Sequence, residues 1–87
     1  MNKTDPPDVK NQIREIVARV LNKPAAEITP DARLFEELDA DSLSSVEILA
    51  VLDKKFNLDL PEEKLVHIER ISQLTDLVLE ELRKKTN

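Results

Sequence analysis

Cysteine, glycine, tryptophan and tyrosine are all absent from this chain of 87 residues, and His67 is its single histidine. Without cysteine, the chain can form neither a disulfide framework nor a thiolate zinc site. One histidine cannot supply a histidine cluster for a metal ion. The absence of glycine also excludes the strained Gly-x-Ser-x-Gly turn that presents the nucleophile of many serine hydrolases. We therefore expect neither a metal site nor catalytic residues in this chain.

Aromatic residues are scarce, because Phe35 and Phe56 are the only two. Proteins that read nucleic acid through its bases usually stack them on aromatic side chains, so we expect no nucleic-acid partner. No apolar run approaches the roughly 18 residues that span a bilayer. Residues 1–8 are polar, contain two prolines and lack the apolar core of a signal peptide. These absences predict a soluble, cytoplasmic protein without stable membrane insertion.

The length limits the chain to one hydrophobic core and so to one domain. We expect a flexible N-terminus over 1–7, a single domain over 8–85 and a C-terminal tail over 86–87. Hydrophobic residues make up 40% of the chain, which suffices for one small core built from Leu, Ile, Val and Ala. We expect a monomer of modest stability.

The negative charge is concentrated in the middle of the chain. Residues 31–63 hold ten acidic and three basic residues, a net charge of −7, whereas the remainder holds eight acids and ten bases, a net charge of +2. Such a field repels nucleic acid and anionic membrane, and it speeds encounter with basic protein surfaces. Simple solubility is the alternative explanation.

Hydrophobic periodicity indicates helices and no convincing strand. Pro6 and Pro7 precede the first periodic segment, where Asp8 suits an N-cap. Ser72 suits the N-cap of the last helix, and Asn57 suits the C-cap of the second. The expected helices cover residues 8–21, 42–56, about 62–67 and 72 onward. We therefore predict an all-α four-helix bundle of three longer helices and one short helix, with a long loop between helices one and two.

That loop, residues 22–41, is longer than compact domains usually tolerate without a function or some local structure. Thr29 and Pro30 have the composition of a helix start, and we expect a short helical turn from there to about Leu38. Apolar side chains of the loop are expected to hold it against the core: Ile28, Leu34, Phe35 and Leu38.

An acidic stretch runs directly into Ser42, which opens the second expected helix. Asp41 or Ser42 can accept hydrogen bonds from the first-turn amides, and Ser44 with Glu47 has capping-box spacing. Catalysis is the least favoured interpretation, because a serine nucleophile needs a general base and nothing brings His67 to it. A third interpretation is covalent attachment of a phosphate-linked group, whose charge the positive end of a helix favours. Asp41 can cap while Ser42 projects, so capping and attachment are compatible.

The second expected helix is apolar on two faces. One stripe comprises Ile48, Leu49, Leu52 and Phe56, and a neighbouring stripe comprises Leu43, Val46 and Ala50. A helix needs one apolar face to pack, so the other is available for binding.

The segment Leu-Asp-Ala-Asp-Ser-Leu-Ser-Ser-Val-Glu-Ile, residues 38–48, resembles the phosphopantetheine attachment motif of acyl carrier proteins. The resemblance extends from about Val9 to Leu82. It implies that Ser42 carries 4′-phosphopantetheine from coenzyme A and that Asp41 supports the transferase. The arm would bring the thiol that the chain lacks.

The resemblance also implies roles for two groups of side chains. Positions that dock partner enzymes in the family match Leu43, Val46, Glu47 and Ala50. Positions of the apolar interior that shelters an acyl chain match Ile48, Leu49, Leu52, Ile68, Ile71 and Leu74.

The implied function is a non-catalytic carrier of acyl intermediates, bound as thioesters, in fatty-acid or related specialised lipid or polyketide biosynthesis. The implied partners are a phosphopantetheinyl transferase (holo-ACP synthase), acyltransferases and ketosynthases with basic docking patches. Two alternatives stay open. One is an aminoacyl or peptidyl carrier, as in D-alanyl or nonribosomal peptide systems, and the other is a non-covalent helical adaptor.

Four positions depart from the pattern of housekeeping fatty-acid carriers. Asp39 stands where these often have glycine, and Ser44, Lys54 and Lys55 stand where they have acids. The expected docking helix is therefore less acidic than in those carriers. This departure bears on the identity of the partner enzymes and leaves the attachment chemistry unaffected.

Overall fold

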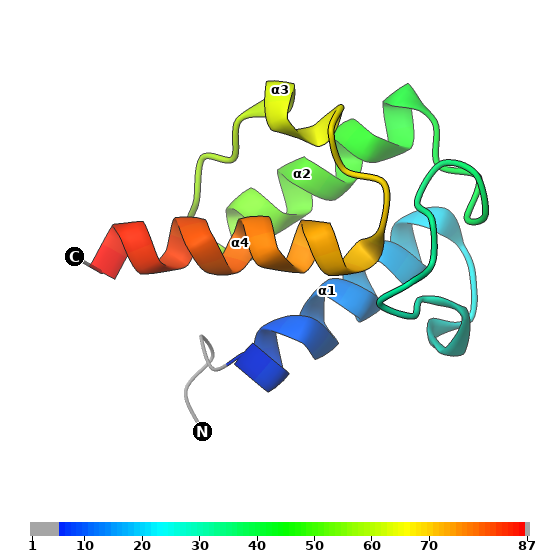
Figure 1. Ribbon diagram of the computed structural model, residues 1–87, viewed down its shortest axis with the longest axis horizontal. Helices are drawn as coiled ribbons and strands as arrows, with labels where there is room; N and C mark the ends of the chain where they lie inside the picture. The colour runs from blue at the N-terminus through cyan, green and yellow to red at the C-terminus, as the bar shows by residue number, and fades with distance from the viewer. Residues whose placement is uncertain (1–5, 87) are drawn as a thin grey trace.

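The computed structural model describes residues 6–86 of the chain. This part is helical, with one isolated β-bridge and no strand. In Figure 1, α4 crosses the molecule with α1 on one side and the α2–α3 pair on the other. The elements are α1 (Pro6–Leu21), the 3-10 helix η1 (Ala25–Glu27), α2 (Ser42–Phe56), α3 (Glu62–Leu65) and α4 (Ile71–Thr86). The predicted all-α bundle of three longer helices and one short helix is confirmed.

The ends of α1 differ slightly from the prediction. The helix begins at Pro6, so Asp8 lies in its first turn and is not its N-cap. Proline suits a first turn because the amide it lacks would have no partner there. Residues 1–5 of the expected flexible N-terminus, and residue 87 of the expected tail, lie outside the described residues, and the division into domains stays a prediction.

Helix α2 has the predicted bounds and the predicted C-cap. Asn57 adopts a left-handed conformation with φ of 55°, and its amide donates to the Asp53 carbonyl. By contrast, Ser72 is not the N-cap of α4, which begins one residue earlier at Ile71. The first amides of α4 donate instead to loop carbonyls, Ile71 to Ala32 at 3.1 Å and Ser72 to Pro30 at 2.9 Å. The Gln73 Oε1 accepts hydrogen bonds from two amides that precede the helix, those of Glu69 and Arg70, at 2.6 and 2.9 Å. Helix α3 ends at Leu65, two residues before the expected end.

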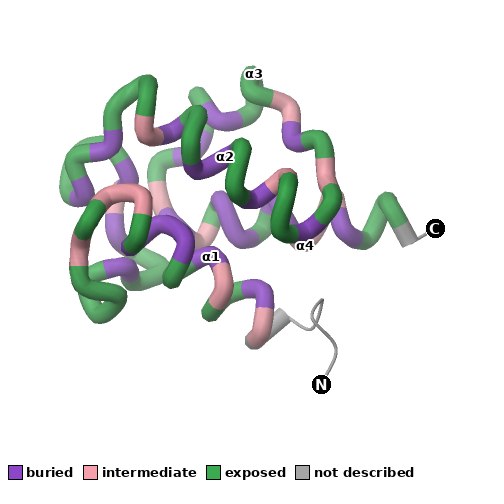
Figure 2. Tube along the Cα trace, turned by 180° about the vertical axis from the view of Figure 1, so that it is seen from behind, coloured by how far each residue is buried: buried purple, intermediate pink, exposed green. Residues whose placement is uncertain are grey.

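The core is aliphatic except for Phe56 and lies between the three longer helices. Figure 2 shows buried positions recurring along each helix, on the sides that face the other helices. Each buried leucine or isoleucine contributes about 1.5–3 kcal/mol to stability. The largest fully buried side chains are Ile13, Ile28, Leu34, Ile48, Leu52, Leu74, Val9, Val17 and Val78. Ile48 and Leu52 turn one face of α2 inward, so the opposite face of that helix is exposed.

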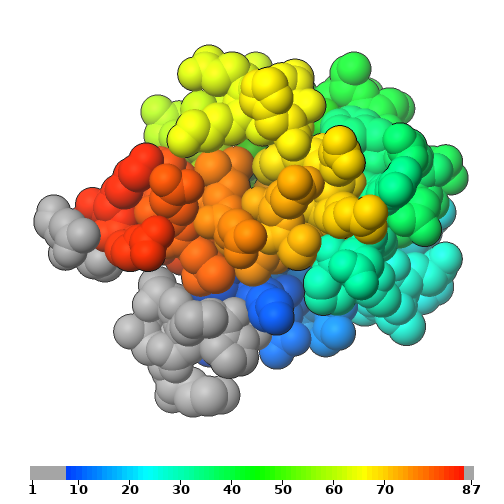
Figure 3. Space-filling view, in the orientation of Figure 1, coloured from blue at the N-terminus to red at the C-terminus, as the bar shows by residue number. Residues whose placement is uncertain are grey.

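The loop between η1 and α2 contains turns and no continuous helix. The expected helical turn from Thr29 to Leu38 is therefore formed only in part: the Ala32 amide donates to the Thr29 carbonyl and the Glu37 amide to the Arg33 carbonyl, both at 3.0 Å. The loop backbone bonds to the segment that leads into α4: the Leu34 amide donates to the Glu69 carbonyl at 2.8 Å, and the Ile71 amide donates to the Ala32 carbonyl at 3.1 Å. Figure 3 shows the loop packed against the start of α4. These long-range bonds interrupt the local turns and hold the loop against the start of α4.

Ile28, Leu34 and Leu38 are buried, as predicted for a loop held against the core. Phe35 was expected to join them, but its side chain is 39% exposed. The turn over residues 34–37 places Leu34 inward and Phe35 outward. No helix among the described residues is long and apolar enough to cross a membrane.

Candidate functional site

Ser42 is the first residue of α2, and the residue before it is the N-cap. The Asp41 side chain accepts a hydrogen bond from the Ser44 amide at 2.8 Å, and the Ser44 hydroxyl accepts one from the Asp41 amide at 2.8 Å. This reciprocal pair is a capping box. Of the two expected cap residues, Asp41 and Ser42, the structure has Asp41. The capping box joins Asp41 and Ser44, and the expected box of Ser44 with Glu47 is wrong. The cap fixes the position of Ser42, at the point where the loop ends and α2 begins.

Three serines follow one another closely, but only one has an uncommitted hydroxyl. Ser44 completes the capping box, and Ser45 is buried with its hydroxyl donating to the Ser42 carbonyl at 2.9 Å. The Ser42 side chain is exposed, and its hydroxyl has no hydrogen-bond partner among the described residues. Ser42 is therefore the serine of this helix turn that a second protein can reach and modify.

Asp41 is held in its ionised form. Hydrogen bonds from the Ser44 amide and, next, from the Ser44 side chain lower the pKa of the Asp41 carboxyl below its ordinary value. The carboxylate is thus present at neutral pH, directly before Ser42. It is exposed to solvent and therefore also accessible to a partner protein.

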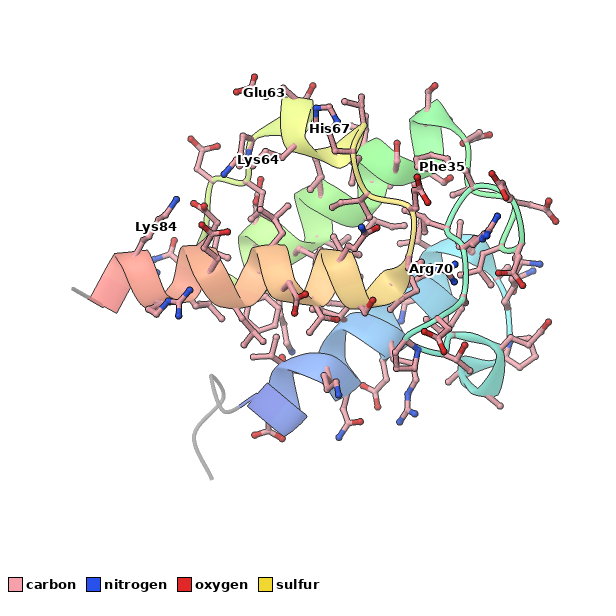
Figure 4. The ribbon with its side chains drawn as sticks, in the orientation of Figure 1. Phe35, Glu63, Lys64, His67, Arg70 and Lys84 are labelled. Carbon is pink, nitrogen blue, oxygen red and sulfur yellow. The ribbon has the colours of Figure 1, made fainter. Side chains whose placement is uncertain are left out.

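Ser42 opens onto a groove of about 420 Å³ between α2 and α3. Phe35 enters this groove from the loop and lies near the beginning of α2 (Figure 4). A second depression of about 320 Å³ shares Val46, Leu49 and Glu62 with the groove and continues along α2. The groove is lined by Phe35, Ser42, Ser45, Val46, Leu49, Glu62, Leu65 and Val66. A mainly apolar track therefore starts at Ser42.

The four side chains expected to dock partner enzymes all lie on the outer face of α2. Leu43 is 69% exposed and Val46 48% exposed, and Glu47 and Ala50 are exposed as well. An exposed leucine and valine within one turn form an apolar patch, and burying this patch against a partner would be favourable in free energy. Sequence reasoning missed two further members of this surface, Val51 on α2 and Val66 after α3. For Val51, the four-residue spacing from Glu47 was an available signal.

The six side chains expected to shelter an acyl chain are all buried: Ile48, Leu49, Leu52, Ile68, Ile71 and Leu74. They belong to one continuous core, and only Leu49 among them lines the groove at Ser42. The core is closed in this structure. An apolar chain would enter it only after the helices beside the groove moved apart.

His67 does not approach Ser42. It follows α3, is exposed, and lines a different depression, between α3 and α4, with Asp76 and Glu80 (Figure 4). The groove at Ser42 therefore contains no imidazole that could act as a base. No group of three or more potential metal-binding side chains occurs among residues 6–86.

The surroundings of Ser42 fit a phosphate-linked arm. The exposed hydroxyl stands at the positive end of a helix of 15 residues, where an anion is stabilised. Two acids precede it, but the Asp41 carboxylate is engaged by Ser44, and Asp39 lies 4.0 Å from the Lys23 ammonium. The apolar track offers a surface on which such an arm and its cargo can lie.

Comparisons with known proteins agree with this geometry. Residues 11–78 match the family model described as the phosphopantetheine attachment site. An acyl carrier protein of Rickettsia typhi is 34% identical over 80 residues, which cover 92% of this chain and 91% of that protein. An acyl carrier protein of Helicobacter pylori is 39% identical over 66 residues, which cover 76% of this chain and 81% of that protein. This chain therefore belongs to the acyl carrier protein family, whose cofactor is 4′-phosphopantetheine.

Proposed function

We propose that the chain carries acyl intermediates on a 4′-phosphopantetheine arm attached to Ser42. The observation that carries this proposal is the exposed Ser42 hydroxyl, which lacks a hydrogen-bond partner among the described residues and stands at the N-terminus of α2. When bound, the arm supplies a terminal thiol that holds acyl groups as thioesters. Members of the family act as carriers and not as catalysts, and we propose the same for this chain.

Attachment requires chemistry that a transferase provides. The Ser42 oxygen attacks the phosphorus of coenzyme A that bears the pantetheine arm. An oxygen–phosphorus bond forms, the phosphoanhydride bond breaks, and the nucleotide half of coenzyme A leaves with that electron pair. The serine proton passes to a base of the transferase, which also binds the Mg²⁺ ion. Asp41, ionised and accessible, supports this encounter by facing cationic groups of the transferase.

The chain's own contribution is presentation, docking and shelter. The capping box fixes Ser42 at the N-terminus of α2. A thiol tethered there is held at high local concentration beside a docked enzyme. Leu43, Val46, Glu47 and Ala50 are the proposed docking residues. Docking on so small a surface is weak and salt-sensitive, which permits prompt release. The proposed acyl shelter is the interior beneath the groove, reached when α3 moves away from α2.

The proposed pathway is fatty-acid synthesis or a related specialised lipid or polyketide pathway, in the cytoplasm and with the carrier as a monomer. The proposed partners are a phosphopantetheinyl transferase, acyltransferases and ketosynthases with basic docking patches. Incubation of the loaded protein with an acyl-transferring enzyme or with an adenylating enzyme separates acyl carriage from aminoacyl or peptidyl carriage.

The test is intact-mass analysis of the purified protein after incubation with coenzyme A and a phosphopantetheinyl transferase. We expect the wild type to gain the mass of the arm once. Ser42→Ala is expected to fold and to stay at its unmodified mass. Ser72→Ala is the matched control, because it removes a serine hydroxyl on α4 and leaves Ser42 and the capping box in place, and it is expected to be loaded. A wild type that gains no mass would leave the chain a non-covalent adaptor and overturn the proposal.

A further inference from the structure

The outer face of α2 carries opposite charges at its two ends. Residues spaced by three and four positions, Leu43, Glu47, Ala50 and Lys54, share one stripe of that face and are all exposed. Lys55 follows Glu47 and Val51 on the adjacent stripe. The apolar docking patch is therefore continuous with acidic residues toward Ser42 and with lysines toward Phe56.

The acidic end comprises Asp39, Asp41 and Glu47, all exposed. The last acid of α2, Asp53, is half-buried, and its Oδ1 accepts a hydrogen bond from the Leu60 amide at 2.9 Å. It lies on the groove side of the helix with Val46 and Leu49, and not on the stripe that runs from Leu43 to Lys54. From Asp41 to Lys54 the helix rises about 20 Å. This separation is about two screening lengths at moderate ionic strength, so the two ends act as distinct charges.

The lysines at the other end are not used inside the molecule. Neither Lys54 nor Lys55 forms an ion pair with a described residue. Lys85 from α4 already satisfies the C-terminal carbonyls of α2, with its Nζ 2.8 Å from the Asn57 oxygen. The helix dipole favours cations in this turn, but it does not explain why Lys54 lies in line with Leu43 and Ala50. Complementarity to an external surface would explain that placement.

We infer that the α2 face fits a partner enzyme whose docking surface is ordered in charge, cationic opposite Asp41 and Glu47 and anionic opposite Lys54 and Lys55. The inference rests on the proposed function and deepens it. Its first occupant is the transferase that loads Ser42. A partner with a uniformly cationic surface would place like charges against the two lysines, which costs affinity. The order of charges therefore selects among enzymes that act on carriers of this fold.

The alternatives fit the face less well. A second copy bound antiparallel along α2 would also pair acids with lysines, but it would cover Val46 and the groove at Ser42. An anionic lipid surface would attract the lysines and repel Asp41 and Glu47 on the same face. An enzyme that approaches the Ser42 end and extends along α2 satisfies both charged ends at once.

The test measures kcat/KM for loading of the apo protein by the transferase with coenzyme A, for the wild type and two double variants. Lys54→Glu/Lys55→Glu makes the α2 face uniformly acidic. Lys10→Glu/Arg14→Glu changes the net charge equally on α1, where both side chains are exposed and neither forms an ion pair with a described residue. We expect kcat/KM to fall about tenfold for the α2 variant and to change less than about twofold for the α1 variant. About 1 M salt, with a screening length of roughly 3 Å, should remove the difference.

If the charge reversal weakens folding, Lys54→Gln/Lys55→Gln provides a milder test that only removes the two charges. We expect its kcat/KM for loading to fall about threefold. An unchanged or faster rate for both α2 variants would overturn the inference, since the docking surface would then be uniformly cationic or would end before Lys54. A concentration-dependent dimer of the wild type, absent in the variant, would assign the face to a second copy and would also overturn it. If even the wild type is never loaded, the proposed function fails and the inference falls with it.

Discussion

Helices α2 and α3 form the two walls of the groove at Ser42, and they are held in place very differently. Helix α2 has 15 residues, a capping box at its start and a left-handed asparagine at its end. Helix α3 has four residues, lacks a side-chain cap and buries only Leu65. One wall is therefore a fixed support for Ser42. The other wall, α3, is a single turn, and its displacement breaks few contacts. Such a wall suits a groove that must open to give access to the core.

The largest expected effect tests the fixed wall. Leu52 is fully buried in α2, so Leu52→Ala should lower the free energy of unfolding by about 2–5 kcal/mol, through lost apolar burial and the cavity that remains. Urea denaturation measures the loss. Leu65→Ala on α3 is expected to cost less, because α3 can collapse into the space. Equal losses would contradict the difference between the walls.

Native-state hydrogen exchange compares the two walls directly. We expect the central amides of α2 to exchange with a free energy near that of global unfolding. The amides of α3 should exchange at least about 30-fold faster, because one short turn can open alone. Similar protection in both helices would show that α3 is as firmly held as α2, and the proposed route into the core would need another moving element.

The cap of α2 gives an intermediate effect that depends on pH. Asp41→Ala should lower the Tm by roughly 5 °C at neutral pH, because the Ser44 amide loses its acceptor. Because the folded pKa of Asp41 is lowered, its contribution is complete above the ordinary aspartate pKa of about 3.9 and is lost as pH falls through the folded value.

Asp41→Asn separates the cap from the charge. Asparagine caps nearly as well as aspartate, so the variant should keep its helicity and lose the acid dependence. It should also be loaded more slowly, since the proposed contact with the transferase needs the carboxylate. An unchanged loading rate would remove Asp41 from the docking site.

The smallest expected effect concerns Asp39, whose φ of 60° is left-handed. Asp39→Gly should raise the free energy of unfolding by about 0.5 kcal/mol at most, because glycine adopts this conformation without a Cβ penalty but loses more entropy on folding. Asp39→Ala removes the same charge and is expected to be destabilising. If the Asp39→Ala variant were as stable as the Asp39→Gly variant, the lost ion pair with Lys23, and not the backbone conformation, would account for the change in the free energy of unfolding.

Features determined by neighbouring residues could be predicted from the sequence. The bounds of α2, its Asp41 cap and its Asn57 cap follow from side chains within a few positions of each helix end. The helical bundle and the burial of the six interior side chains follow from hydrophobic spacing, since one face of each helix must pack.

Features determined by distant contacts could not be predicted from the sequence. The loop forms no continuous helix, because its backbone between two local turns bonds to Glu69 and Ile71, more than 30 positions away. Ser72 is not the N-cap of α4, and the first amides of that helix donate to the carbonyls of Ala32 and Pro30 in the distant loop. The sequence also could not distinguish the serines of α2 by their hydrogen bonds, because adjacent serines are chemically identical until Ser45 is buried.

The central claim is that Ser42, and not a neighbouring serine, bears the arm. Fragmentation mass spectrometry of the loaded wild-type protein tests it directly, because the added mass can be assigned to one side chain within residues 38–48. The account predicts the arm on Ser42 alone. An arm found on Ser44 or Ser45 would contradict it, since those hydroxyls are engaged in the capping box and in the bond to the Ser42 carbonyl.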